Sequence, residues 1–317
     1  MEWSKIVGQN QAIELLERSL ELKSIAPAYL FVGANGIGRK LTAKCFCHHL
    51  LCVNKADFEK ALQQKKIEEG NHPDLLWIEP TYQYKGEFFT LEQAIEAGLK
   101  RKSPPGIRIE QVREIGRFLS RPPLESERAM VVIESAETMT EGAANALLKT
   151  LEEPGRATLI LIAPATESLL PTLVSRCQRV PFYRLSESAL KEVLKKQGYG
   201  FILEQEEIIG LAQGSPGEAI NISETLETIP EDLRNSLLDL PSQPLQLMNL
   251  AKNITNHLDT ETQIHLINYL QYCFWKKYKD QEMIKHLEGA RGSLLSYAQP
   301  RLVWECILLK FLPASVH

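Results

Sequence analysis

Five short apolar runs, separated by helix-like segments, constrain the fold of this chain more than any other feature of its sequence. Each run is four to six residues long, and the segments between them include helical periods over 9–22, 109–119 and 142–151. Continuous apolar runs of this length are typical of strands that are buried on both faces of a parallel sheet. The alternation of strand and helix therefore predicts an α/β domain with a mostly parallel sheet. The expected strands cover residues 28–32, 74–78, 129–133, 158–163 and 179–182.

The strand pattern stops near residue 185, and the remainder of the chain shows helical periods only. We expect three domains: the α/β domain over residues 1–185, a small domain of short helices over 186–228, and a larger helical domain over 229–317. The small domain is expected to contain breaks at its glycine-rich segments, and the larger one near its prolines.

Two inserts interrupt the α/β domain. Residues 53–71 are highly charged and predict a helix. Residues 80–106, which contain Lys100-Arg101-Lys102, predict an excursion on the surface.

The composition excludes several classes of protein. The chain has 317 residues, with 36 Lys and Arg against 40 Asp and Glu, and a net charge of −4. This balance argues against a dedicated nucleic-acid binder with a large basic field and leaves room only for a local basic stripe. There is no run of about 18 apolar residues to span a membrane, and the polar N-terminus is not that of a signal peptide. We therefore expect a cytoplasmic protein, and six cysteines are too few for a disulfide scaffold.

A glycine-rich loop follows the first expected strand and precedes a helix, which is the setting of a phosphate-binding loop. Gly33, Gly36 and Gly38 would let backbone N–H groups surround phosphates, while a lysine and a following Ser or Thr bind phosphate oxygens and Mg²⁺. In this chain Arg39 stands at the lysine position and Lys40 at the Ser/Thr position. We expect the shape of the loop without its catalytic chemistry; the alternative is a loop that still binds nucleotide.

A second motif of the same chemistry ends the third expected strand. ATPases with a phosphate-binding loop place acidic side chains at the end of this strand, where the carboxylates bind the metal and activate water. Glu134 is present, but Ser135 stands where the general base is expected, and a serine takes no proton from water at neutral pH. Because Lys40 also replaces the metal-binding hydroxyl, we expect Glu134 simply to cap its strand; the alternative is a carboxylate that still contacts Mg²⁺.

A cluster of cysteines occupies the helix expected after the loop. Cys45, Cys47 and Cys52 lie close to two histidines, which are the residue types of a metal site. Structural zinc needs four ligands, however, and residues 53–72 contain no further cysteine. Small cysteines are also ordinary on a helix that packs against a sheet. We therefore expect buried thiols and no zinc.

A row of arginines marks the helix expected before the third strand. Arg113, Arg117 and Arg121 are spaced by four residues, so the first two share one face of the helix, and Glu110 and Glu114 line a neighbouring face. A salt-bridged surface helix explains this pattern, and the spacing by itself favours it. The alternative is a contact with DNA phosphates.

Four further stretches carry a resemblance to a known family. They are Ile6-Val7-Gly8-Gln9, AYLFVG over residues 28–33, NALLKTLEEP over residues 145–154 and LLPTLVSRCQ over residues 169–178. Together they are similar to the clamp-loader branch of the AAA+ ATPases, by motif over about residues 4–225 and by architecture over the helical remainder. The resemblance implies an AAA+ domain, then a small helical lid, then a helical collar through which subunits assemble.

Within this branch, the altered loop and the missing base are similar to the delta-prime kind of subunit of bacterial DNA polymerase III. That resemblance implies a chain with no ATPase of its own and no catalytically bound cofactor, since ATP is bound by its neighbours. It implies gamma/tau and delta subunits as partners, and a role in loading the sliding clamp (beta) onto primer-template DNA. It further implies that Arg113 faces DNA phosphates and that part of the apolar stripes at 264–275 and 302–312 lies between subunits. Two other functions stay open: an active ATPase of the gamma/tau kind, and an AAA+-derived scaffold outside replication.

The tripeptide Ser175-Arg176-Cys177 carries the mechanistic expectation of this resemblance. In clamp loaders, the arginine of this motif projects toward the γ-phosphate of ATP that is held by the neighbouring subunit. A fixed guanidinium there stabilises charge that develops on the transferred phosphoryl group, and a lysine cannot copy its planar fork. The alternative is an arginine that pairs with a carboxylate beside its strand.

Overall fold

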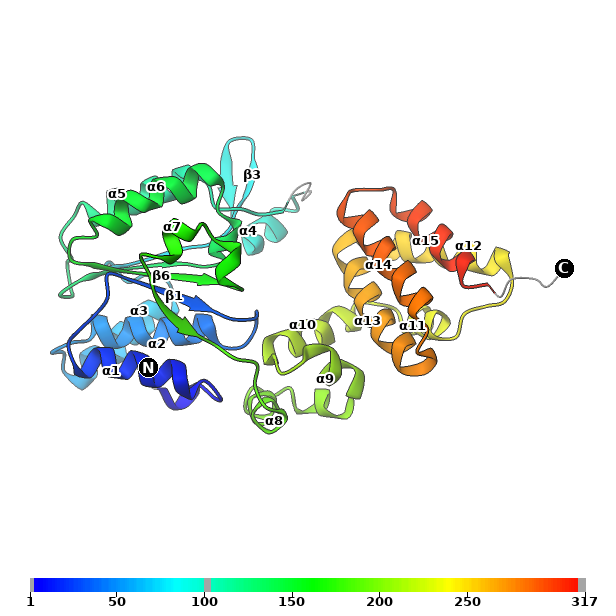
Figure 1. Cartoon of the computed structure of the whole chain (residues 1–317), viewed down its shortest axis with the longest axis horizontal. Coiled ribbons are helices and arrows are strands. Elements are labelled where there is room, and N and C mark those ends of the chain that lie inside the picture. The colour runs from blue at the N-terminus through cyan, green and yellow to red at the C-terminus, as the bar shows by residue number, and fades with distance from the viewer. Residues whose placement is uncertain (1–2, 100–103, 313–317) are drawn as a thin grey trace. The chain divides into compact units, whose positions relative to one another are not determined.

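The computed structural model describes residues 3–99 and 104–312 of the chain and divides it into two compact units, residues 1–190 and 191–317 (Figure 1). The first unit holds every strand of the main sheet, and the second is built from helices. The second unit contains the expected collar and the expected lid except for residues 186–190. The division of lid and collar into two domains stays a prediction. None of the described helices is long and apolar enough to cross a membrane.

The first unit is built on a five-stranded sheet in the order β2-β5-β6-β1-β7, in which all neighbouring strands are parallel. This arrangement confirms the predicted α/β domain. The central strands β5 and β6 are buried along their whole length, whereas the edge strand β2 is half-buried. The strands are β1 (Ala28–Val32), β2 (Leu75–Ile78), β5 (Ala129–Ile133), β6 (Ala157–Ala163) and β7 (Gln178–Pro181).

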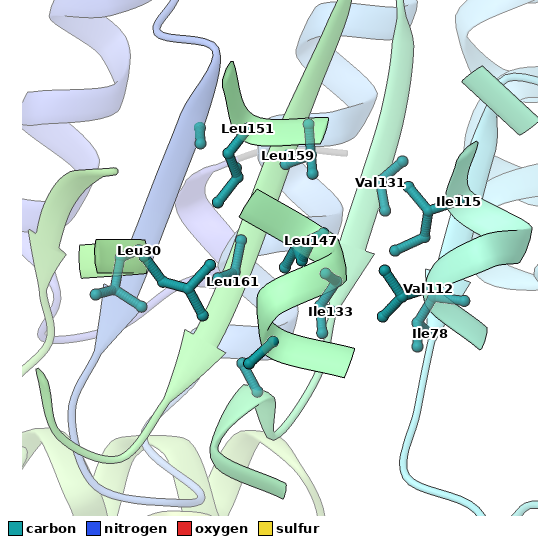
Figure 2. Packing of buried hydrophobic residues seen from close by; sticks show 14 of the residues in the cluster. Leu30, Ile78, Val112, Ile115, Val131, Ile133, Leu147, Leu151, Leu159 and Leu161 are labelled. Carbon is teal, nitrogen blue, oxygen red and sulfur yellow. The ribbon is translucent and has the colours of Figure 1, made fainter. Parts of the chain in front are cut away.

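Helices cover both faces of this sheet, which is why the strands are apolar on every side. Figure 1 shows α5, α6 and α7 on one face and α1, α2 and α3 on the other. In Figure 2, alternate strand residues such as Val131 and Ile133 of β5 point toward Ile115 of α5 and Leu147 of α6. The helices of this unit are α1 (Asn10–Glu21), α2 (Arg39–Leu51), α3 (Asp57–Glu68), α4 (Leu91–Glu96), α5 (Ile109–Leu119), α6 (Glu141–Glu152) and α7 (Pro171–Val174).

Both inserts leave the sheet intact. The first contains α3, as its charge pattern predicts. The second contains an antiparallel hairpin, β3 (Tyr82–Tyr84) with β4 (Glu87–Phe89), followed by α4. Its two turn residues, Lys85 and Gly86, have φ values of 50° and 90°, as the favoured two-residue hairpin turns require. Sequence analysis did not predict this hairpin, and Lys100-Arg101-Lys102 lie outside the described residues.

The second unit packs its helices around large buried side chains. Trp304 is fully buried and donates a hydrogen bond from Nε1 to Oε1 of Gln263, at 2.9 Å. The helical pattern was expected to break near Pro244 and Pro300, and both residues stand at the start of helices. Proline is tolerated there, because the first N–H groups of a helix have no partner within it. The helices are α8 (Glu187–Lys196), which spans the unit boundary, α9 (Glu206–Ala212), α10 (Pro216–Glu227), α11 (Glu231–Leu238), α12 (Pro244–His257), α13 (Thr260–Tyr278), α14 (Gln281–Leu295) and α15 (Pro300–Lys310).

Candidate functional site

The glycine-rich loop connects β1 to α2, at the carboxyl edge of the sheet. Gly36 and Gly38 have φ values of 72° and 100°, which favour glycine. Gly33 is required for a different reason: a Cβ atom there would lie 2.5 Å from the carbonyl oxygen of Phe182. The loop therefore packs directly against the chain that leaves β7. This close approach keeps a glycine at position 33 whether or not a phosphate binds.

Arg39, at the position of the phosphate-binding lysine, is folded back on the loop. Its Nη2 donates a hydrogen bond to Oδ1 of Asn35, one turn earlier, and the side chain is only 8% exposed. Burial lowers the pKa of Arg39, while the nearby Glu137 and Glu134 oppose that change. Its Nη1 is buried and has no hydrogen-bond partner among the described residues.

Lys40, at the position of the metal-binding hydroxyl, lies between two carboxylates. Its Nζ is 2.8 Å from Oε2 of Glu134 and 3.0 Å from Oε1 of Glu79. Burial would lower the pKa of Lys40, but hydrogen bonds and charge from the two glutamates outweigh burial and raise it. The ammonium thus lies where a divalent cation would bind the two carboxylates, and it offsets one of their two formal negative charges.

The two glutamates come from the ends of neighbouring strands. Glu134 follows β5, and its backbone N–H donates to the carbonyl of Ile78 at 2.9 Å. Its carboxylate also accepts a hydrogen bond from Nε1 of Trp77, at 3.1 Å. Glu79 follows β2, and sequence analysis did not single it out, because nothing in the local pattern separates it from other surface glutamates.

Ser135 stands in a left-handed turn directly after Glu134. Its φ and ψ are 49° and 51°, and its carbonyl accepts a hydrogen bond from Oγ1 of Thr138 at 2.8 Å. The position carries a hydroxymethyl group where a general base would need a carboxylate.

The cysteine cluster is packed as apolar side chains. Cys45 and Cys47 of α2 are fully buried, and Cys52 is nearly so. Burial raises the pKa of Cys45 to about 11 and that of Cys47 further, which disfavours the thiolate that a metal requires. No group of three metal-binding side chains occurs among residues 3–99 and 104–312. That the chain binds no zinc stays a prediction.

Arg176 lies just beyond α7, near the carboxyl end of α6. Its Nη2 is 2.8 Å from Oε1 of Glu152, and its Nη1 donates to the carbonyl oxygen of Thr172 at 3.0 Å. The carboxylate pairing that the alternative interpretation predicts is therefore present. The side chain is nevertheless 37% exposed. Its neighbours hold the segment in place. The hydroxyl of Ser175 donates a hydrogen bond to the carbonyl oxygen of Thr172, and Cys177 packs against the buried cluster that includes residues of α6 and α7.

Comparison with known proteins assigns both units. A family model described as the delta subunit of DNA polymerase III matches residues 8–186. A second model, described as the C-terminal domain of cyanobacterial DNA polymerase III delta prime, matches residues 188–311. This chain belongs to the DNA polymerase III delta-prime family.

Individual relatives agree with this family. The chain is 33% identical to DNA polymerase III subunit delta' of Bacillus subtilis over 192 residues, which are 60% of this chain and 52% of the relative. It is 32% identical to the delta' subunit of Pseudomonas aeruginosa over 199 residues, 60% of this chain and 54% of the relative. The matched part thus spans about half the length of each. A solved structure of a gamma-subunit-related protein from Thermotoga maritima shares the fold, with a TM-score of 0.57 at 19% identity over 95% of this chain and 98% of that one.

The arginines of α5 do not form one continuous row in this delta-prime family member. Arg113 and Arg117 lie on α5 and line a hollow against α6, whereas Arg121 follows the end of the helix at Leu119. Lys149 of α6 lines the same hollow. Sequence analysis did not assign Lys149 to this cationic group, although it is part of the NALLK motif, because the neighbouring helix is known only from the fold.

Proposed function

We propose that this chain is a non-catalytic, delta-prime-like subunit of a cytoplasmic clamp-loader complex that belongs to the DNA polymerase III holoenzyme. It assembles with gamma/tau and delta subunits, supplies Arg176 to the ATP site of a neighbour, and helps to load the beta clamp onto primer-template DNA. It uses no cofactor of its own, since ATP is bound by neighbouring subunits. Membership of the delta-prime family supports the complex, and the environment of Lys40 carries the argument that this chain does not hydrolyse ATP.

The obstacle that Lys40 presents to hydrolysis is electrostatic. Hydrolysis of ATP in such a site needs Mg²⁺ at the loop and a carboxylate that positions water. Here the ammonium of Lys40 already lies within 3.0 Å of both nearby carboxylates, so a cation would have to displace a charge that is part of the chain. Ser135 adds a second defect, because it cannot act as the base.

The absence of intrinsic ATPase activity can be measured on the purified chain. We expect ATP turnover at background, with or without primed DNA. A DNA-stimulated turnover that is lost on Lys40→Ala would contradict this part of the proposal.

The role of Arg176 rests on its exposure and on its donors. A guanidinium carries five N–H donors, and the contacts to Glu152 and Thr172 involve only its two terminal nitrogens. The group therefore keeps donors for phosphate oxygens. Its exposed ion pair is of the kind that contributes little to stability, about 0–1 kcal/mol, so a structural role does not account for the arginine.

Substitution of Arg176 tests the trans role in the complex reconstituted with gamma/tau and delta. We expect Arg176→Ala to leave melting and assembly unchanged and to lower ATP turnover and clamp loading. An arginine finger is worth on the order of 10³-fold at a single site, and the loss in the whole complex is smaller because other sites continue to work. Arg176→Lys should restore little of the lost turnover, because lysine lacks the planar fork of arginine. Arg179→Ala, at an exposed position of β7, is the matched control. Unchanged turnover in an assembled Arg176→Ala complex would reject the role.

Arg113 is proposed to contact DNA phosphate from the hollow it shares with Arg117 and Lys149. We expect Arg113→Gln to weaken binding of primed DNA by the complex for all sequences alike. The slope of log affinity against log salt should become shallower by about 0.7–0.9, as for the loss of one phosphate contact. An unchanged slope would leave α5 as a solvated surface helix.

A further inference from the structure

Glu152 is the last residue of α6 and the ion-pair partner of Arg176. The two residues are 24 positions apart in the sequence, and the carboxylate Oε1 lies 2.8 Å from Nη2 of the guanidinium. On the other side, Nη1 donates to the carbonyl oxygen of Thr172 at 3.0 Å. The guanidinium is thus held at two of its nitrogens by groups from two different helices.

Both helices are anchored in the same core. Leu147 and Leu151 of α6, and Leu173 and Val174 of α7, belong to one buried cluster against the sheet, and Figure 2 shows the two leucines of α6 facing the strands. The carboxylate and the arginine are therefore mounted on one rigid body. A long arginine side chain otherwise loses much rotamer freedom when it is ordered, and a fixed ion pair removes part of that loss in advance.

We propose that Glu152 is a positioning residue for Arg176: it holds the guanidinium in one orientation so that its remaining N–H donors are presented to the neighbour's γ-phosphate. This inference rests on the proposed trans role of Arg176. Half-exposed ion pairs of this kind contribute little to folding, so the effect of Glu152 is expected in the turnover of the complex rather than in the stability of the chain.

The variant Glu152→Gln tests this role with little change of shape. Its amide oxygen still accepts a hydrogen bond, but the charge that strengthens the contact is lost. In the complex reconstituted with gamma/tau and delta, part of the ATP turnover depends on Arg176. We expect kcat for this part to fall by about two- to five-fold. KM for ATP, the melting temperature of the isolated chain and assembly should be unchanged. Glu153→Gln, at the adjacent exposed carboxylate, is the matched control and should behave as the wild type.

A double-variant cycle separates positioning from an independent effect. In an Arg176→Ala background, Glu152→Gln should cause no further loss. If Arg176→Ala lowers turnover but Glu152→Gln does not, or raises it, the positioning role is wrong and the trans role of Arg176 stands. Additive losses, or a lower melting temperature with failed assembly, would also overturn it. If Arg176→Ala itself has no effect, the proposed function fails at that site, and the role of Glu152 fails with it.

Discussion

Lys40 places a positive charge at the position where a phosphate-binding loop carries a hydroxyl. A Ser or Thr at this position would offer a hydroxyl to a metal, whereas Lys40 brings the positive charge itself and places it against Glu79 and Glu134. The same two carboxylates, freed from the lysine, would form an acidic pair at the ends of two adjacent strands.

We expect Lys40→Thr to lower the melting temperature by about 1–4 °C, which is the effect of losing a partly exposed ion pair in a domain of this size. Millimolar Mg²⁺ should recover part of the loss, because a divalent cation can then replace the ammonium between the two carboxylates. Thermal melts with and without Mg²⁺ check this. Lys44→Thr is the control: Lys44 lies over the same Trp77 ring, with its Nζ 5.7 Å from the centroid, and its loss should create no dependence on Mg²⁺.

His49 makes the stability of the chain depend on pH. Burial, with a smaller contribution from His48, lowers the pKa of His49 to about 4 from 6.5, and its ring stacks on Trp3 at 4.9 Å. Between these two pH values the unfolded chain binds more protons than the folded one. The contribution of His49 to the free energy of unfolding is therefore fully present above about pH 6.5, and it is lost as the pH falls toward 4.

The variant His49→Phe keeps a ring against Trp3 and removes the titration, so we expect it to flatten this acid-side loss. Denaturant unfolding between pH 7 and 4.5 measures the slope. The slope will not vanish, because burial also lowers the pKa values of His48 and His72. An unchanged slope in His49→Phe would contradict the assignment.

The contact between α9 and α13 depends on a glycine within a helix, Gly210. In the second unit, α9 approaches α13 so closely that a Cβ atom on Gly210 would lie 2.1 Å from the hydroxyl oxygen of Tyr272 and 2.5 Å from its ring. A glycine inside a helix normally weakens it. Close packing is the reason for its presence here.

Gly210→Ala should therefore destabilise the chain by about 1–3 kcal/mol, because the ring of Tyr272 has to move. The outcome is opposite for Gly289→Ala in α14, where nothing lies within 4 Å of an added Cβ; that variant should gain about 0.5–1 kcal/mol from helix propensity. Chemical denaturation of both variants provides the comparison. Equal and stabilising effects would mean that α9 and α13 can separate at no cost.

The surface of the second unit carries exposed leucines that bear on the proposed assembly with other subunits. Helices α12 and α15 pack against each other, yet each carries leucines on its exposed side. Leu245 of α12 is 70% exposed and Leu302 of α15 is 56% exposed. Leu302 belongs to the apolar stripe at 302–312, part of which is expected between subunits, and its exposed side chain is a candidate for that part. Leu245 lies outside the two expected stripes and is a second candidate, because it does not contribute to the core of this unit.

Leu245→Glu and Leu302→Glu, made singly, should each abolish or weaken co-elution with gamma/tau and delta in gel filtration. The circular dichroism and melting temperature of the isolated chain should not change, because neither leucine is buried there. Leu22→Glu, at an equally exposed leucine after α1, is the control for added charge. Normal assembly of both variants would place the interface elsewhere on the chain.

The fold followed from local pattern to a large extent. The apolar runs at 28–32, 129–133 and 158–163 form the buried strands β1, β5 and β6, because a strand covered on both faces needs an apolar residue at nearly every position. The hairpin β3–β4 escaped prediction because strands of three residues are too short to show a period.

The altered loop and Ser135 were also visible in the sequence, because motif positions are fixed by spacing along the chain. The ion-pair partners of Lys40 and Arg176 were not visible in the sequence. Glu79 lies near Glu134 because β2 pairs with β5 in the sheet, and Lys40 of α2 contacts both carboxylates. Arg176 meets Glu152 because α6 and α7 pack on one core. Residue type and spacing therefore determined which side chains of the two motifs are replaced in this chain. Strand order and helix packing decided which charges face each other, since ion pairs form between side chains that are close in space rather than in sequence.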